Sequence, residues 1–401
     1  MKTLKQKKKS KLLQSNMKYD FDNIANRLHT SSIKWDVKDN ELPMWVADMD
    51  FVVAPEIQDA IIKATKNGYG YTYPTEEFFK SYQSWWSTRH HVNIDTSWMV
   101  FASGVVSALD SIVRSLTEEG DGVMLLTPVY HTFFNVIRNN KRKIVNSNLI
   151  RQNDNYLINY QDVEEKFKTE NVKALIFCNP HNPMGLIWEK EEIKKLSDLC
   201  KKYGVIFISD EIHCDIVDPG YEYNSALLVN EDAIMCVSPG KVFNLAGIHS
   251  SVVITRDEQL RKQLQEAFYR DDIGEPNYFA IPANVAAYTK GAEYVNQLNQ
   301  YLYKNKEYVS SFIKENLSQV RLVSGHATYL LWIDITALNI RSDIFCRELQ
   351  EKTGLILSPG LQFGEEGAFF LRMNIATSLT NVKEAMNRLK EYIDAKEKDN
   401  A

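Results

Sequence analysis

The sequence predicts an α/β fold built on a mainly parallel seven-stranded sheet that is covered by helices. Between about residues 100 and 255, short β-rich runs alternate with helical patterns, and the runs end at Gly, Pro, Asn or Asp. This alternation is typical of parallel strands joined by crossover helices. The 401 residues exceed one typical core, so we expect more than one domain.

The strands of the large domain are expected in apolar runs that stop at turn residues. The clearest runs are residues 100–101, 123–126, 174–178, 205–208 and 233–237. Between the third and fourth runs, residues 189–202 carry Ile193, Leu196, Leu199 and Cys200 at helical spacing. A further helical pattern over residues 108–116 follows the first run, which completes the strand-helix alternation.

The sequence changes character after residue 290, where a smaller α+β domain is predicted. Its expected elements are a long polar helix over residues 292–317, a strand at 329–333, a helix near 342–352, a strand at 369–375 and a last helix from 381. The N-terminal segment is expected to join this domain. The predicted division is a basic tail at 1–16, an N-terminal part of the small domain at 17–55, a large domain at 56–290 and the rest of the small domain at 291–401.

Composition narrows the classes of function. The net charge is only −5, so the protein as a whole has no strong electrostatic potential that would favour binding to nucleic acid or to a membrane surface. The first sixteen residues hold six lysines and no acid, without the apolar run of a secretory signal, so a disordered tail is expected and a nucleic-acid role for it is the minor alternative. Five cysteines without metal-ligand spacing predict reduced core thiols, and no metal. A cytoplasmic protein acting on a small molecule is expected.

Three motifs lie where neighbouring parallel strands end, at residues 179–185, 209–215 and 238–247. Ligands of such sheets gather beyond the carboxyl ends of the strands, so the three motifs should converge in space. Their order and residue types suit pyridoxal 5'-phosphate. Each motif has a commoner explanation when it is taken alone, and the combination favours the cofactor.

The cofactor needs an amine, and Lys241 is the candidate, provided its surroundings lower its pKa from about 10.4. Asp210 suits the protonated ring nitrogen, although a lone aspartate is more often a helix cap or a solvated loop residue. Asn182 is suited to donate to the phenolic oxygen, or else it is only a turn residue between prolines. His213 either hydrogen-bonds the same oxygen or only packs.

The phosphate needs free backbone N–H groups at the start of a helix. Gly104, Val105 and Val106 supply them after the strand at 100–101, and Ser238 offers a hydroxyl. Tyr130 either stacks on the cofactor ring or is an ordinary buried aromatic residue.

From about residue 17 to the final helix, the chain resembles fold-type I pyridoxal-phosphate enzymes of the class I/II aminotransferase superfamily. More narrowly, it is similar to MalY/PatB-type cystathionine β-lyases. The narrower resemblance rests on residues 19–27, 32–36, 44–51, 179–183 and 209–213. The resemblance implies the cofactor roles given above and adds a substrate site.

By that resemblance, Arg372 clamps the substrate α-carboxylate and Ala47 contacts the substrate. Tyr71 reaches the phosphate of a neighbouring subunit, which implies a homodimer with shared active sites. Two positions depart from the pattern. Gly240 stands where many relatives have serine, and His249 stands where aspartate aminotransferases often have arginine, which puts the cofactor affinity in doubt.

The implied reaction is β-elimination from L-cystathionine, or from L-cysteine, to a thiol, pyruvate and ammonia. An aminotransferase of amino acids is the first alternative, because it shares every cofactor contact. A binding or regulatory protein that keeps the fold without catalysis is the second alternative, and the joint presence of Lys241, Asp210 and Arg372 argues against it.

Overall fold

The computed structural model describes residues 18–323 and 325–399 and confirms the predicted fold class. The strands of the large sheet are ordered β2-β10-β9-β8-β7-β3-β4. Strand β10 runs antiparallel to β2 and β9, and the other neighbours are parallel. The bounds are β2 (Met99–Ala102), β3 (Gly122–Thr127), β4 (Lys143–Asn148), β7 (Val172–Cys178), β8 (Ile206–Asp210), β9 (Ile234–Val237) and β10 (Ser251–Ile254).

Helices pack on both faces of this sheet because its strands bury side chains on both sides. In β7, Ala174 and Ile176 belong to one core and Leu175 and Phe177 to the other, which is the alternation of an extended chain. The first core holds α4 (Val105–Leu116), α5 (Thr132–Asn139) and α8 (Glu258–Arg270). The second holds α3 (Glu76–Arg89), α6 (Tyr160–Thr169), α7 (Lys190–Tyr203) and α9 (Ala280–Lys290).

Strand β4 was missed from the sequence, and helix α4 begins earlier than predicted. Strand β4 lies at the sheet edge, where exposed and buried residues alternate, so it lacks the continuous apolar run of a central strand. Helix α4 begins at Val105 instead of residue 108, directly after Gly104. Strand β10 was also not predicted.

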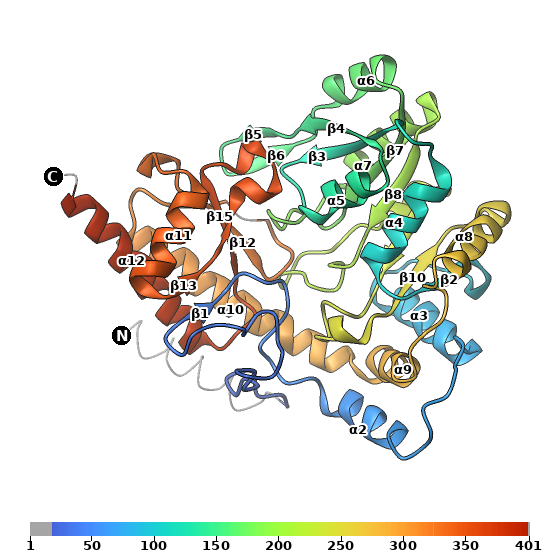
Figure 1. The fold of residues 1–401 in the computed structure, drawn as a ribbon, viewed down its shortest axis with the longest axis horizontal. Coiled ribbons are helices and arrows are strands. Elements are labelled where there is room, and N and C mark those ends of the chain that lie inside the picture. The colour runs from blue at the N-terminus through green and yellow to red at the C-terminus, as the bar shows by residue number, and fades with distance from the viewer. Residues whose placement is uncertain (1–17, 324, 400–401) are drawn as a thin grey trace.

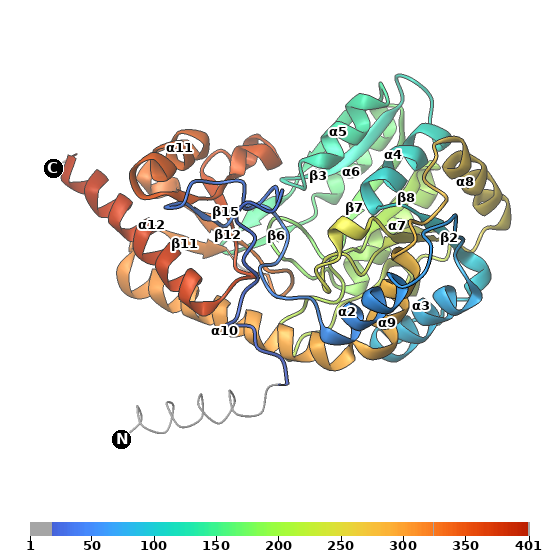
Figure 2. The same ribbon diagram turned by 60° about the horizontal axis from the view of Figure 1, so that its bottom comes forward.

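Both chain ends contribute to a second group of elements (Figures 1 and 2). A four-stranded sheet has the order β11-β12-β15-β14, and β1 near the N-terminus pairs with β13 near the C-terminus. The long helix α10 runs beneath this group toward the large sheet. The elements are β1 (Leu42–Pro43), α10 (Ala292–Asn316), β11 (Arg321–Val323), β12 (Leu330–Asp334), α11 (Ser342–Thr353), β13 (Leu355–Ile356), β14 (Ser358–Pro359), β15 (Phe370–Asn374) and α12 (Leu379–Asp399).

The remaining α-helix is α2 (Pro55–Ala64), and β5 (Ile150–Gln152) and β6 (Asn155–Leu157) form a hairpin. The predicted basic tail at 1–16 lies outside the described residues. None of the described helices combines the length and apolarity that a membrane crossing requires.

Candidate active site

The carboxyl ends of β7, β8 and β9 meet at a cavity of about 240 Å³. Adjacent parallel strands end at the same sheet edge, which is why their following residues converge. The cavity is lined by every residue predicted to bind the cofactor except Tyr71, namely Gly104, Val105, Val106, Tyr130, Asn182, Asp210, His213, Ser238 and Lys241.

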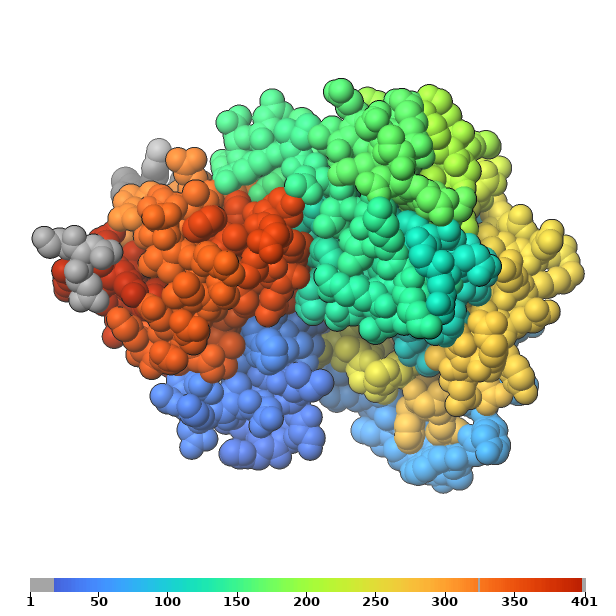
Figure 3. All heavy atoms as spheres, turned by 45° about the horizontal axis from the view of Figure 1, so that its top comes forward, coloured from blue at the N-terminus to red at the C-terminus, as the bar shows by residue number. Residues whose placement is uncertain are grey.

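A larger cavity of about 1170 Å³ adjoins the first, because Tyr130, Lys241, Ala246 and His249 line both. Its wall includes the two residues predicted to bind the substrate, Ala47 and Arg372. The lining comes from segments far apart in the chain. Their surfaces adjoin one another in Figure 3, as the blue N-terminal part, the teal residues near 135 and the orange-red C-terminal part.

Lys241 lies between the two cavities. Its Nζ donates a hydrogen bond of 2.8 Å to the carbonyl oxygen of Ala47. Burial and the nearby Arg372 lower the pKa of Lys241 to about 8, against the opposing effect of Asp48 and Asp210. This is the direction that an amine used as a nucleophile or a base requires.

Asp210 is the last residue of β8, and only 5% of it is exposed. Burial raises its pKa to about 6, although the backbone N–H of Ile212 donates to its Oδ1 at 3.1 Å and Lys241 favours the charged form. The protein therefore gives this buried carboxylate too few hydrogen-bond donors and positive charges to offset the cost of burying its charge. A protonated nitrogen from a bound ring would supply the missing partner.

Arg372 on β15 lies 3% exposed at the inner end of the larger cavity. Its guanidinium donates to Asn182 Oδ1 at 3.2 Å and to the carbonyl oxygen of Trp45 at 2.7 Å. Burial lowers its pKa to about 10, and its Nε has no partner among the described residues. The geometry thus joins the predicted carboxylate clamp to the predicted cofactor ligand Asn182.

His213 is buried in the wall of the smaller cavity, edge-on to Tyr329 with ring centroids 6.2 Å apart. Burial places the pKa of His213 well below its ordinary value, so the ring is neutral. Within residues 18–323 and 325–399 its Nδ1 has no hydrogen-bond partner. The side chain packs, and it also keeps one polar atom available to a ligand.

The start of α4 also lines the smaller cavity. Gly104 adopts φ +127, a backbone region that favours glycine, and the chain then enters the twelve-residue helix. The Gly104 N–H donates to Ser251 Oγ at 3.2 Å, which leaves the first-turn donors of Val105 and Val106 for an anion.

Ser238 lines the cavity, but its hydroxyl donates to the carbonyl oxygen of Ser250 at 2.6 Å. The same oxygen accepts the N–H of Gly240 at 3.0 Å. A Cβ at Gly240, the position where many relatives have serine, would stand 3.0 Å from Ser238 Oγ, so a side chain there would require the Ser238 hydroxyl to shift. A bound phosphate would reach this hydroxyl only after it rotates.

Taken together, the smaller cavity fits pyridoxal 5'-phosphate. It offers an amine at Lys241, an under-compensated carboxylate at Asp210, an unpartnered ring nitrogen at His213 and free N–H groups at the start of α4. Tyr130, half-buried and edge-on to Phe133 at 5.6 Å, lines the same space.

Tyr71 is not brought to either cavity. It is fully exposed in the segment between α2 and α3, so a role toward the phosphate of a second subunit stays a prediction.

The sequence did not predict how the loop at residues 44–51 is held over Lys241. The carbonyl oxygen of Ala47 also accepts the hydroxyl of Tyr329 at 2.9 Å. Asn374 donates to the carbonyl oxygens of Val46 and Asp48 at 2.6 and 2.7 Å, and Asn244 donates to that of Met49 at 2.9 Å. Asn244 lies in the motif at 238–247 with Lys241, and Asn374 lies in the predicted strand at 369–375 with Arg372, but their long-range partners leave no sequence signal.

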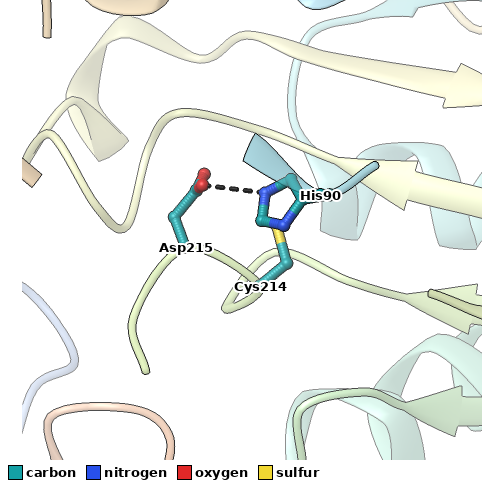
Figure 4. A group of neighbouring side chains, drawn as sticks. All are labelled: His90, Cys214 and Asp215. Carbon is teal, nitrogen blue, oxygen red and sulfur yellow. Dashed lines mark hydrogen bonds and ion pairs between the residues drawn. The ribbon is translucent and has the colours of Figure 1, made fainter. Parts of the chain in front are cut away.

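A second group of polar side chains lies just beyond the cofactor cavity, where His90, Cys214 and Asp215 gather (Figure 4). Asp215 Oδ1 accepts Nε2 of His90 and the indole N–H of Trp85, both at 2.9 Å, and lies 3.2 Å from Nε of Arg89. These partners hold the pKa of Asp215 below its ordinary value despite its burial. The carboxylate is therefore neutralised within the protein, which suits a structural role that ties α3 to the segment after β8.

Comparisons with known proteins identify the family of this chain. The family model for aminotransferase class I and II matches residues 38–389. Cystathionine beta-lyase PatB of Bacillus subtilis (strain 168) is 34% identical over 92% of this chain and 99% of its own length.

Two solved structures with pyridoxal phosphate bound are also similar. Cystalysin from Treponema denticola has a TM-score of 0.90 at 32% identity, covering 94% of this chain and 100% of that one. The C-S lyase from Staphylococcus hominis has a TM-score of 0.89 at 30% identity, covering 94% of this chain and 98% of that one. The chain therefore belongs to the class I and II aminotransferase family of fold-type I pyridoxal-phosphate enzymes, and within that family it is similar to lyases of the PatB and MalY type.

Proposed function

We propose that this protein is a pyridoxal-phosphate-dependent carbon–sulfur β-lyase that cleaves L-cystathionine, and L-cysteine in the same way, to a thiol, pyruvate and ammonia. The observation that carries the proposal is the position of the Lys241 amine on the wall shared by the two cavities. One cavity suits the cofactor, and the other carries Arg372 for the carboxylate of an amino acid.

When bound, pyridoxal phosphate supplies an aldehyde for an amine and a ring that withdraws electrons from the amino-acid Cα. Asp210 would accept a hydrogen bond from the ring nitrogen, and Asn182 and His213 would face the phenolic oxygen. The N–H groups of Val105 and Val106 hold the phosphate.

Arg372 orients the substrate by a bidentate contact with its α-carboxylate. Lys241 then takes the Cα proton. Its pKa of about 8 leaves roughly a tenth of the amine neutral at pH 7, far more than an ordinary lysine offers. Proton removal at Cα expels the sulfur substituent from Cβ as a thiolate, and the larger cavity has room for that group.

The rival activity is amino-acid transamination, which the family name includes. It would use the same residues up to removal of the Cα proton and then return the proton to the cofactor carbon. The similarity to PatB over 92% of this chain favours the lyase.

The experiment supplies purified holoenzyme with L-cystathionine, L-cysteine and amino acids without a β-substituent. Pyruvate should appear in an amount equal to the homocysteine released from L-cystathionine and to the sulfide released from L-cysteine. Keto acid and pyridoxamine phosphate without thiol release would establish the aminotransferase activity. If neither set of products appeared, both the lyase and the aminotransferase proposals would be wrong.

The state of Lys241 can be tested without turnover. Because only the neutral amine attacks an aldehyde, the rate at which apo-protein captures the cofactor should rise with pH and level off above about pH 8. Stopped-flow absorbance measures this rate. Lys241→Ala should abolish capture, whereas Lys262→Ala, at an exposed position on α8, should leave it unchanged; a rate independent of pH from 6 to 9 would contradict the lowered pKa.

We also propose a homodimer. The full exposure of the aromatic Tyr71 supports a contact with a second copy. Sedimentation of the holoenzyme measures the mass, and a monomer at micromolar concentration would remove the proposed shared site.

A further inference from the structure

Helix α5 turns one face toward the larger cavity. His131, Phe134, Asn135 and Arg138 line the cavity, and their spacing of three, four and seven residues is that of a single helical face. The N-terminal end of this face lies near Arg372. Besides burial, the charge of that guanidinium lowers the pKa of His131.

Arg138 lies at the other end of the same face. Seven residues of α-helix separate it from His131, a rise of about 10 Å. Its side chain is exposed, with the guanidinium carbon 5.7 Å from the centre of the Phe134 ring. The cavity is therefore bounded by one buried arginine beside the reacting groups and a second arginine farther out.

Besides the buried Arg372, the cavity is lined by the less buried Arg27 and Arg138, which differ in their partners. Arg27 also lines the cavity, but Asp48 Oδ2 lies 2.8 Å from its Nη2 and neutralises it. No carboxylate in the part of the chain that the structure describes lies within ion-pairing distance of Arg138. Arg138 is thus the cation with capacity for an external anion.

We propose that Arg138 determines substrate specificity by binding the distal carboxylate of a β-thioether amino acid. The proposal rests on the proposed function, because it uses Arg372 for the α-carboxylate of the same molecule. A guanidinium binds a carboxylate through two parallel N–H bonds, which fixes the far end of an extended substrate.

The neighbouring lining residues suit the rest of such a molecule. Asn135, one turn before Arg138, and Gln362 offer amides, and Glu365 offers a carboxylate for a distal ammonium group. Phe134 gives an apolar surface beside the thioether. Cystathionine carries a thioether, a distal carboxylate and a distal ammonium group. S-methylcysteine has the thioether but lacks the distal carboxylate and the distal ammonium group.

The test compares kcat/KM for L-cystathionine and S-methyl-L-cysteine, measured as pyruvate release by the holoenzyme. Arg138→Ala should lower the value for cystathionine about tenfold, mainly through KM, and leave that for S-methylcysteine within about twofold. Arg138→Lys should recover part of the loss, and Arg138→Glu should deepen it. Lys141→Ala removes a neighbouring surface cation outside the cavity and should change neither value.

The outcomes separate this proposal from the proposed function. Equal effects of Arg138→Ala on both substrates, or no effect on either, would overturn the role of Arg138 while the lyase stands. Release of pyruvate from neither substrate by the unsubstituted enzyme would overturn the lyase and this role together. Since Arg138 is exposed, its variants should melt within a few degrees of the unsubstituted protein, which a thermal scan checks.

Discussion

Two buried aspartates, five residues apart on one segment, are treated in opposite ways. Asp215 has His90, Trp85 and Arg89 around one oxygen, and its pKa is lowered. Asp210 receives one backbone N–H, and burial raises its pKa to about 6. The protein thus neutralises the charge of Asp215 from within, whereas it leaves the charge of Asp210 with a single donor, as the proposed pairing with a cofactor ring nitrogen requires.

Glu211, next to Asp210, is a third case. Burial raises its pKa to about 7, although the N–H of Ala226 and the hydroxyls of Ser209 and Ser225 donate to it at 2.8 to 2.9 Å. Tyr223 donates to it as well. This carboxyl joins the end of β8 to residues 223–226, which is a structural role.

Exchanging each aspartate for asparagine should separate the two roles most strongly. Asp210→Asn should lower kcat about a hundredfold or more, because an amide does not stabilise a protonated ring nitrogen, and should not destabilise the apo-protein. Asp215→Asn should cost about 3–5 kcal/mol in the free energy of unfolding, because Arg89 and His90 lose their buried anion. Urea unfolding measures the change in the free energy of unfolding of each variant, and the kcat of the folded enzyme measures the effect on turnover.

The comparison would break if the two variants behaved alike. A loss of kcat in folded Asp215→Asn equal to that of Asp210→Asn would place Asp215 in the chemistry. A stability loss in apo Asp210→Asn equal to that of Asp215→Asn would show that the Asp210 carboxylate already has stabilising partners within the apo-protein.

The pH dependence of apo-protein stability should have opposite signs for the two groups. The raised pKa of Asp210 gives stability that is complete below its ordinary value of 3.8 and lost as pH rises through about 6, by up to roughly 3 kcal/mol. The lowered pKa of Asp215 gives stability that is present above that ordinary value and lost as pH falls below it.

The measurement is the difference in unfolding free energy between the unsubstituted apo-protein and Asp210→Asn from pH 4 to 7. Saturating pyridoxal phosphate should abolish the trend, because the ring nitrogen then pairs with Asp210. A flat difference without the cofactor would mean that Asp210 titrates normally.

The smallest effect is expected at Glu211. Below about pH 7 its carboxyl is largely protonated, so Glu211→Gln replaces one uncharged group by another of similar shape. The loss at pH 6 should be about 1 kcal/mol or less, because the hydroxyls of Tyr223 and Ser225 can turn to accept from the amide. Glu211→Ala is the control and should cost more, and equal losses from the two variants would mean that the hydrogen bonds to residue 211 contribute nothing.

The inner site was predictable from sequence because it depends on local signals. Lys241, Asp210 and Asn182 each follow an apolar run, and parallel strands bring such positions to one edge. The role of Ser250 as partner of Ser238 and the hold of Asn374 on the loop at 44–51 depend on contacts between distant segments. The predicted domain boundaries and the partner role of Tyr71 stay predictions.

The hydrogen bonds from Asn374 to the carbonyl oxygens of Val46 and Asp48 also have a consequence for the synthesis of the protein. A ribosome makes the loop at 44–51 early and β15 almost at the end, and domains fold as their residues emerge. The residues of the large sheet, and Lys241, are therefore made before the strand that supplies two anchors of the loop over this lysine.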